Sequence, residues 1–251
     1  MKDLLRYFHE AVQTVEDVEL LKKKILELAV RGKLVKQDPN DEPASILLER
    51  IQEEKERLIK EKKIKRTKPL PRITPGEIPY ELPEGWEWIR CGDISINIHY
   101  GYTASALDKD TGVKFLRISD IQDSKVFWDT VPFCEIDQKN LEKNKLHTHD
   151  ILIARTGGTI GKSYIISRVE GQAVFASYLI RMIPSEQINA QYVKYFLETN
   201  LYWEQLKEKS QGTGQPNVNA TSLSQLKLPL PSFEEQKRIV DKIEELYVTW
   251  L

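Results

Sequence analysis

The sequence predicts an α+β protein, in which a mixed α/β globular domain is flanked by long helices that pack in the manner of a coiled coil. Three observations lead to this prediction. Segments near both ends repeat apolar residues every three or four positions, a proline-rich stretch follows the first of them, and short β-branched and aromatic runs bounded by turns fill the middle. A chain of 251 residues with 40% hydrophobic residues is long enough to bury a core.

Residues 4–30 are expected to form one helix, because their apolar residues lie in a narrow stripe. Gly32 is a stop signal for this helix. A second helix is expected over residues 44–65, with Asp41 as its cap and Pro43 in its first turn. Since narrow apolar stripes need cover, we expect these two helices to pair with each other or with another chain.

The second helix is strongly charged. From Glu49 to Lys68, 14 of 20 residues are charged and nine of these are basic. This pattern is typical of a solvated face with i,i+4 ion pairs, and a face that contacts phosphates is the alternative. Five prolines between Pro69 and Pro83 then predict an extended linker.

The remaining elements follow from local pattern and turn signals. Strands are expected at 114–118, 150–155, 163–166 and 176–182, a helix at 189–208, a polar loop at 210–222, and a last helix at 233–248 with a Ser232–Glu235 capping box. The predicted organisation is a helical region at 1–68, a linker at 69–85, a globular domain at 86–232 and the start of a helical region at 233–251.

Charge and composition limit the classes of function. The net charge of −1 excludes a globally basic nucleic-acid binder, although residues 1–68 carry +3 and residues 69–251 carry −4, so a local basic patch remains open. Two cysteines form neither a disulfide framework nor a zinc site. With no signal peptide and no apolar run long enough to span a membrane, we expect a cytoplasmic protein without a membrane partner.

A glycine-rich segment, Thr156–Ser163, directly follows a predicted strand. It falls short of a phosphate-binding P-loop, because Thr156 stands where that motif needs glycine and Tyr164–Ser167 favours a strand over a helix. Residues 151–169 nevertheless hold three basic residues and no acidic one. Glycine lets backbone amides approach a phosphate closely, so this turn suits a nucleic-acid backbone. A plain β-turn is the alternative.

A second acid-free stretch, residues 209–231, is rich in amide side chains, which can pair with the major-groove edge of adenine. A plain surface loop is the alternative. His147 and His149 would share one face of a strand, but no third ligand stands near them in the sequence, and we expect no metal site. No catalytic constellation is evident either.

Several segments, taken in order, resemble one family. They are 29–51, Leu82–Trp88 with Gly92–Ile94, Phe115–Ile121, Asp150–Lys162 (DILIARTGGTIGK), and Gly214–Asn219 leading into Leu228–Pro231 and Glu234–Val240. Together they resemble the DNA-specificity subunit of type I restriction–modification enzymes, over nearly the whole chain.

The resemblance implies a non-catalytic subunit. It would direct adenine methylation and restriction by positioning type I methyltransferase subunits, which supply S-adenosylmethionine, and a motor/nuclease subunit on double-stranded DNA. Family members carry two target recognition domains and use their helices as a spacer, whereas this sequence has one such domain. We therefore expect a homodimer that reads a palindromic bipartite site, or else a truncated cassette. A coiled-coil adaptor without DNA contact is the rival interpretation.

The expected DNA-binding residues lie in three segments. They are Tyr100, Tyr102 and Thr103; Arg155, Thr156, Gly157, Gly158, Thr159 and Lys162 in the glycine-rich turn; and Gln211, Thr213, Gln215 and Asn217 in the polar loop.

Overall fold

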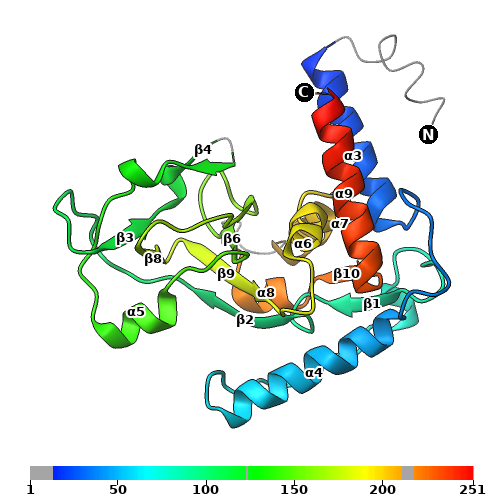
Figure 1. Ribbon diagram of the computed structural model, residues 1–251, viewed down its shortest axis with the longest axis horizontal. Coiled ribbons are helices and arrows are strands. Elements are labelled where there is room, and N and C mark those ends of the chain that lie inside the picture. The colour runs from blue at the N-terminus through cyan, green and yellow to red at the C-terminus, as the bar shows by residue number, and fades with distance from the viewer. Residues whose placement is uncertain (1–13, 123, 211–217, 251) are drawn as a thin grey trace.

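The computed structural model describes residues 14–122, 124–210 and 218–250 (Figure 1). Its α-helices are α3 (Val15–Val30), α4 (Ala44–Lys60), α5 (Gln138–Asn144), α6 (Ala190–Phe196), α7 (Asn200–Ser210), α8 (Ala220–Ser224) and α9 (Phe233–Trp250), and its 3-10 helices are η1 (Pro75–Glu77), η2 (Ile118–Asp120) and η3 (Trp128–Thr130). Its strands are β1 (Glu87–Arg90), β2 (Ser95–Tyr100), β3 (Val113–Leu116), β4 (Ile121–Gln122), β5 (Lys125–Val126), β6 (Ile151–Ala154), β7 (Ser163–Ile165), β8 (Gln172–Phe175), β9 (Leu179–Pro184) and β10 (Lys227–Leu230).

The central feature is an antiparallel four-stranded sheet in the order β2-β9-β6-β7. Three two-stranded ladders accompany it: antiparallel β1-β10, parallel β3-β8 and antiparallel β4-β5. Successive side chains of β6 point to opposite faces of the sheet and so join two hydrophobic clusters. Ile151 and Ile153 pack with the helices on one face. Leu152 and Ala154 pack with η3 and β8 on the other face. The sheet is thus buried on both faces.

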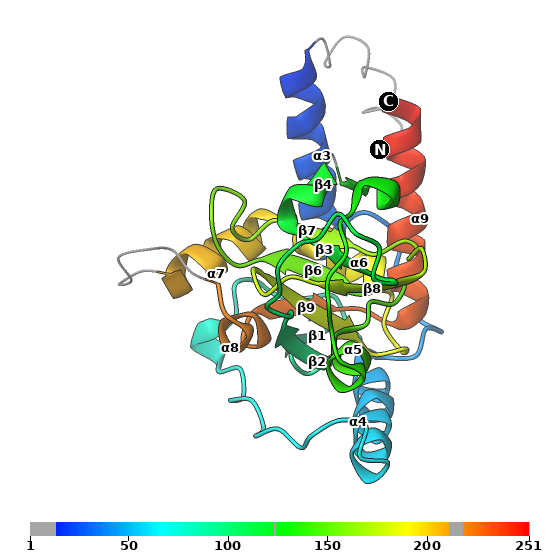
Figure 2. The same cartoon turned by 90° about the vertical axis from the view of Figure 1, so that its left-hand side faces the viewer.

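Helices α3 and α9 lie side by side and antiparallel, and they project from the sheets as a two-helix arm (Figure 1). Ile25 and Leu26 of α3 and Ile239 and Ile243 of α9 are buried in one cluster that also includes α6. Helix α4 lies apart from this arm, on the opposite side of the globular domain (Figures 1 and 2). The partner of the α3 stripe is therefore α9, and the predicted pairing of the first two helices with each other is wrong.

Helix α4 packs on the globular domain instead. Leu47 and Ile51 are buried in the main core, and Lys55 Nζ donates to the carbonyl oxygens of Gly92 and Asp93 at 2.7 and 2.6 Å. Burial lowers the pKa of Lys55 from its ordinary value. The contacts at the end of β1 explain why a helix with so thin an apolar stripe is stable in this place.

The ends of the first two helices differ from the prediction. Thr14 is extended and caps α3 through reciprocal bonds with Asp17, so a single helix over 4–30 is wrong at Thr14, and residues 4–13 lie outside the described range. Gly32, with φ of 64°, ends α3 as predicted. Pro43, not Asp41, is the N-cap of α4, which ends at Lys60 rather than at residue 65.

The C-terminal half contains further corrections. The helix predicted at 189–208 is two helices, because α6 ends by Leu197 and the Thr199 hydroxyl accepts from Tyr202 N near the start of α7. The predicted loop at 210–222 contains the beginning of α8, capped by Asn219. The strand predicted at 176–182 lies at Leu179–Pro184. The other three predicted strands are found within one or two residues.

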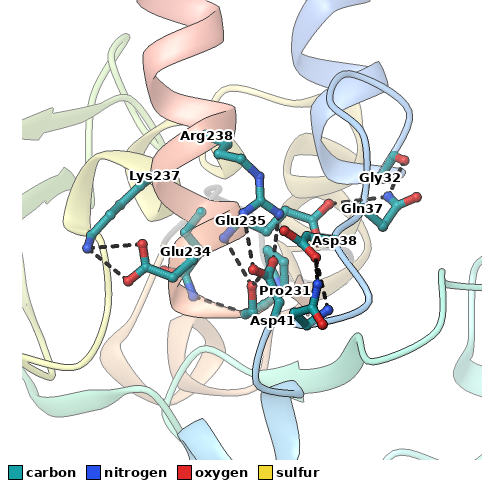
Figure 3. A network of polar contacts seen from close by, with 12 residues as sticks. Gly32, Gln37, Asp38, Asp41, Pro231, Glu234, Glu235, Lys237 and Arg238 are labelled. Atoms are coloured by element: carbon teal, nitrogen blue, oxygen red, sulfur yellow. Dashed lines mark hydrogen bonds and ion pairs between the residues drawn. The ribbon is translucent and has the colours of Figure 1, made fainter.

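A polar network connects the arm to the globular domain (Figure 3). Arg238 of α9 donates to both carboxylate oxygens of Asp41, at 3.1 and 2.6 Å, and the Ser232 hydroxyl donates to the same carboxylate at 2.8 Å. These bonds lower the pKa of Asp41, and the bond from Arg238 is the largest cause. Asp41 thus fixes the loop before α4 to the start of α9, which is why it does not cap α4.

Glu235 is the second carboxylate of this joint. Ser232 accepts from Glu235 N at 3.0 Å, as the predicted capping box requires, but the Glu235 carboxylate turns away and accepts from Trp86 Nε1 at 2.9 Å and Gln37 Nε2 at 3.2 Å. Burial raises the pKa of Glu235. The carboxylate therefore holds the residue before β1 and the loop after α3 on the same turn of α9.

Candidate nucleic-acid interface

The glycine-rich segment forms an exposed turn between β6 and β7, so the predicted strand–turn–strand arrangement is confirmed. Gly161 N donates to Ala154 O at 2.8 Å, and Lys162 N donates to Thr159 O at 2.9 Å. Gly157 and Gly161 have φ of 79° and 82°, in a region that glycine adopts without strain. Gly157, Gly158, Thr159 and Lys162 are exposed and Thr156 is half-buried. No helix begins here, so the phosphate cradle of a P-loop is absent from this turn.

Helix α7 supports this turn from one side. The Tyr202 hydroxyl donates to Gly161 O at 2.7 Å in a buried contact. A Cβ atom on Gly161 would come within 2.6 Å of both Trp203 and Leu206. Trp203 keeps 39% of its surface exposed next to the turn. Close packing on α7 therefore fixes the base of the turn while its tip stays open to solvent.

The second predicted segment lies at the end of β2. Tyr100 pairs with Ile180 of β9, and Tyr102 forms a bridge with Ala176. A Cβ atom on Gly101 would lie 2.3 Å from Phe175 O, so only glycine fits this path. Thr103 is exposed beyond the bridge.

Arg155 brings these two segments together. Its guanidinium carbon lies 4.5 Å from the centroid of the Tyr100 ring, a cation–π contact. Its backbone N donates to Tyr178 O at 3.1 Å, at the entry to β9. The strand order β2-β9-β6 explains the meeting, because the ends of β2 and β6 both lie beside the start of β9.

Four candidates of the third segment, Gln211, Thr213, Gln215 and Asn217, lie outside the described residues. The residues that follow them are described. Val218 N donates to Arg155 O at 3.2 Å, and Ala220 N donates to the Tyr100 hydroxyl at 3.2 Å. The chain after the third segment therefore meets the other two segments directly.

The charged side chains in the ranges that meet here are cationic. Residues 99–103, 155–162 and 218–222 contain no acidic residue, and they contribute Arg155 and Lys162. Burial, together with repulsion by Arg181, lowers the pKa of His99 to about 4, so His99 is neutral near pH 7. The cations that these three ranges themselves contribute are thus Arg155 and Lys162.

Asp150, which opens the DILIAR segment, has a structural place. Its carboxylate accepts from His147 N at 2.7 Å and lies 3.4 Å from the Arg181 guanidinium, with both side chains buried. Burial raises the pKa of Asp150, and the charge of Arg181 opposes this shift. The pair fixes the start of β6 against β9.

Two exposed aromatic residues near the turn were missed from sequence. Tyr178 is 63% exposed and Trp203 is 39% exposed. Tyr178 falls inside the strand predicted at 176–182, and Trp203 falls inside the helix predicted at 189–208. The sequence contains only a partial signal for these two residues, since a large apolar residue that lies off the buried stripe of a helix indicates a surface role.

His147 and His149 do not share a strand face, because both precede β6 in a turn and His149 has φ of 71°. Within residues 14–122, 124–210 and 218–250, no three His, Cys, Asp or Glu side chains are grouped so that they could hold a metal ion. None of the helices in the same ranges is both long and apolar enough to cross a membrane.

Comparison with known proteins identifies a family that this chain matches. The sequence model of the type I restriction modification DNA specificity domain matches residues 83–249. The chain is 33% identical over 260 residues to the type I restriction enzyme EcoEI specificity subunit of Escherichia coli, and 36% identical over 255 residues to the EcoAI specificity subunit of the same organism. These alignments cover 96% and 97% of this chain but 42% of each relative, so the chain spans about two fifths of their length.

Solved structures agree in fold. The HsdS subunit from Thermoanaerobacter tengcongensis superposes with a TM-score of 0.53 at 18% identity, over 94% of this chain and 50% of that chain. A chain from a study of complex assembly and conformational transition of the type I R-M system superposes with a TM-score of 0.55 at 20% identity, over 93% and 51%. The predicted α+β class, with a mixed globular domain and flanking helices, is confirmed. The family match over two thirds of the chain shows that the protein belongs to the type I restriction–modification DNA specificity family.

Proposed function

We propose that the chain is the sequence-recognition subunit of a type I restriction–modification complex and has no catalytic activity of its own. The observation that carries the proposal is that residues 99–103, residues 155–162 and the chain just after the third segment, at 218–222, meet on one surface of a domain from this family. None of these three ranges contains an acidic residue. An exposed glycine-rich turn with a lysine suits the phosphate backbone, and neighbouring polar side chains suit base edges.

The chemistry would belong to partner subunits. We propose that type I methyltransferase subunits bind S-adenosylmethionine and methylate adenine, that a motor/nuclease subunit carries out restriction, and that this chain holds no cofactor. The complex would work in the cytoplasm on double-stranded DNA. Related proteins described as specificity subunits support this assignment of roles.

The test is to map methylation on DNA modified by the complex of this chain with a type I methyltransferase subunit from the same organism. We expect methylation at one bipartite sequence. Equal methylation of every sequence, or failure of the chain to join the methyltransferase, would contradict the proposal and favour an adaptor without DNA contact.

Lys162→Ala supplies a second measurement. Lys162 is exposed in the turn, so its loss should weaken binding to all DNA sequences and reduce the slope of log K against log salt by about 1. Lys23→Ala is the matched control, since Lys23 is an exposed lysine in the arm helix α3, outside these segments. If both substitutions have the same effect, the turn is not a phosphate contact.

We further propose that the protein acts as a homodimer that reads a palindromic site. The solved relatives are about twice as long as the segment that this chain matches, so a second copy would supply the other half. The described part of the arm also exposes Val15, Leu20 and Val248, at 79%, 68% and 82% of their surface. Exposed apolar side chains on paired helices fit a contact between two copies.

Solution mass tests the dimer. Sedimentation equilibrium of the chain should give twice its mass, and Val248→Glu should give the monomer, while Lys143→Glu should leave the dimer intact. A monomeric chain whose complex methylates an asymmetric sequence would overturn the dimer and indicate a cassette of a longer protein.

A further inference from the structure

Tyr100 and Arg155 are set apart from the other candidate residues by their contacts. The side chains of Thr159 and Lys162 are exposed in the glycine-rich turn, whereas the side chains of Tyr100 and Arg155 contact one another. Arg155 lies over the Tyr100 ring at 4.5 Å, and its Nε is buried with no hydrogen-bond partner among the described residues. A guanidinium whose Nε is buried over a ring has lost part of its hydration, and its position is set by contacts within the protein.

Each of the two residues also binds the backbone that follows the third segment. The Arg155 carbonyl accepts from Val218 N at 3.2 Å, and the Tyr100 hydroxyl accepts from Ala220 N at 3.2 Å. Ala220 is the first residue of α8, and the first amides of a helix have no partner within it. The Asn219 side chain serves Ser222 N instead, so the Tyr100 hydroxyl is the described acceptor for the Ala220 amide.

The backbone at Tyr100 and at Arg155 is held by the sheet. Tyr100 ends β2 in register with Ile180, Arg155 follows β6 directly, and its amide bonds Tyr178 O at the entry to β9. One stacked pair therefore ties together the ends of three strands and the start of α8.

We propose that Tyr100 and Arg155 are positioning residues, which hold residues 218–220 against the glycine-rich turn and so set the discrimination between DNA sequences without contacting DNA themselves. This inference rests on the proposed function. Its physical basis is that base readout needs donors and acceptors fixed to within a fraction of an ångström, so a loosened support reduces specific binding and leaves backbone attraction unchanged.

The test compares variants of the chain in its complex with the methyltransferase subunit. Two duplexes serve as probes, one that carries the sequence methylated by the wild-type complex and one scrambled duplex of the same composition. Arg155→Ala and Tyr100→Phe should each lower the ratio of specific to scrambled affinity by about 3- to 20-fold, with the salt slope unchanged. Arg155→Ala combined with Tyr100→Ala should lower the ratio no further than Tyr100→Ala alone, because loss of the Tyr100 ring already removes the contact that the Arg155 side chain makes with it.

Arg168→Ala is the matched control, because Arg168 is the other arginine of the acid-free stretch and pairs with Glu170 at the surface. It should leave the ratio unchanged. Amide hydrogen exchange of the chain in the absence of DNA gives an independent readout. Exchange at Ala220 should accelerate in Tyr100→Phe, which keeps the ring but loses the acceptor, and the thermal midpoint should stay close to the wild type.

The outcomes separate the two proposals. If Arg155→Ala weakens both duplexes equally and lowers the salt slope by about 1, Arg155 is a phosphate contact, and the positioning role is overturned while the proposed function stands. Unchanged exchange at Ala220 in Tyr100→Phe also overturns the positioning role. If the wild-type complex does not distinguish the two duplexes, the proposed function itself fails, and the positioning role fails with it.

Discussion

Asp41→Ala should loosen the connection between the arm and the globular domain. The substitution removes both bonds from Arg238, at 3.1 and 2.6 Å, and leaves the buried Ser232 hydroxyl without its acceptor at 2.8 Å. Neither change creates a large cavity, so the loss is mainly electrostatic and hydrogen bonding.

The magnitude follows from these contacts. A bidentate pair between charged groups acts as one unit and contributes about 1.5–3 kcal/mol, and a neutral hydroxyl bond adds about 1 kcal/mol. Because the Arg238 side chain keeps 35% of its surface exposed, against 14% for Asp41, the pair falls at the low end of its range. We expect Asp41→Ala to lower the free energy of unfolding by about 2–3 kcal/mol, or the Tm by roughly 4–12 °C.

Urea unfolding of Asp41→Ala, Arg238→Ala and the double variant measures the coupling directly. The two losses should be non-additive by about 1–2 kcal/mol. Lys237→Ala is the neighbouring control, since its pair with Glu234 is solvent-exposed and should change stability by less than about 0.5 kcal/mol. A loss below about 1 kcal/mol for Asp41→Ala, or strictly additive single effects, would refute the role given to this pair.

Three further predictions concern the turn and the joint. Gly161→Ala should destabilise the protein by at least about 2 kcal/mol in thermal unfolding, because φ is 82° and Trp203 lies 2.6 Å from the new Cβ, whereas Gly158→Ala, with nothing within 4 Å, should be nearly neutral. Trp86→Phe should cost about 1–3 kcal/mol by urea unfolding, since it removes the donor to the buried Glu235 carboxylate, and an unchanged midpoint would contradict this. Burial raises the pKa of Glu235, so the stability contributed by its protonated form is fully present below its unfolded pKa of about 4.3 and is lost as pH rises through the folded pKa. Glu235→Gln should flatten this part of the stability–pH curve. An identical slope in both proteins would count against this role of Glu235.

Local pattern predicted the elements whose signals lie within a few residues. The apolar run at Ile151–Ala154 marked β6, and Gly32 marked the end of α3. The start of α3 had a local signal too, since Thr14 and Asp17 form a capping box, but the apolar stripe that continues before it outweighed that signal. The break between α6 and α7 likewise contains no glycine or proline, and only the capping role of Thr199 marks it.

Elements that depend on distant partners were beyond local pattern. Strand β10 contains Pro229, which by itself argues against a strand, and it is stable because it pairs with β1 about 140 residues earlier. The pairing of α3 with α9 is equally non-local. For the candidate site, composition identified the glycine-rich turn and the family resemblance identified the Tyr100 segment, but their meeting through Arg155 depends on the order β2-β9-β6, which a single sequence does not reveal.

The ladder between β1 and β10 has a consequence for how this architecture can change. Glu87 pairs with Leu230, and Cys91 N donates to Leu226 O. The chain therefore leaves the region of the flanking helices at β1 and returns to it at β10, which lies beside β1. The intervening 134 residues, 92–225, begin and end beside one another at this ladder, and within them α6 packs against both arm helices. A replacement that preserves the apolar face of the ladder and the face of α6 that packs on the arm could therefore alter what the domain binds and leave the arm as it is, so that binding and arm packing can evolve as separate events.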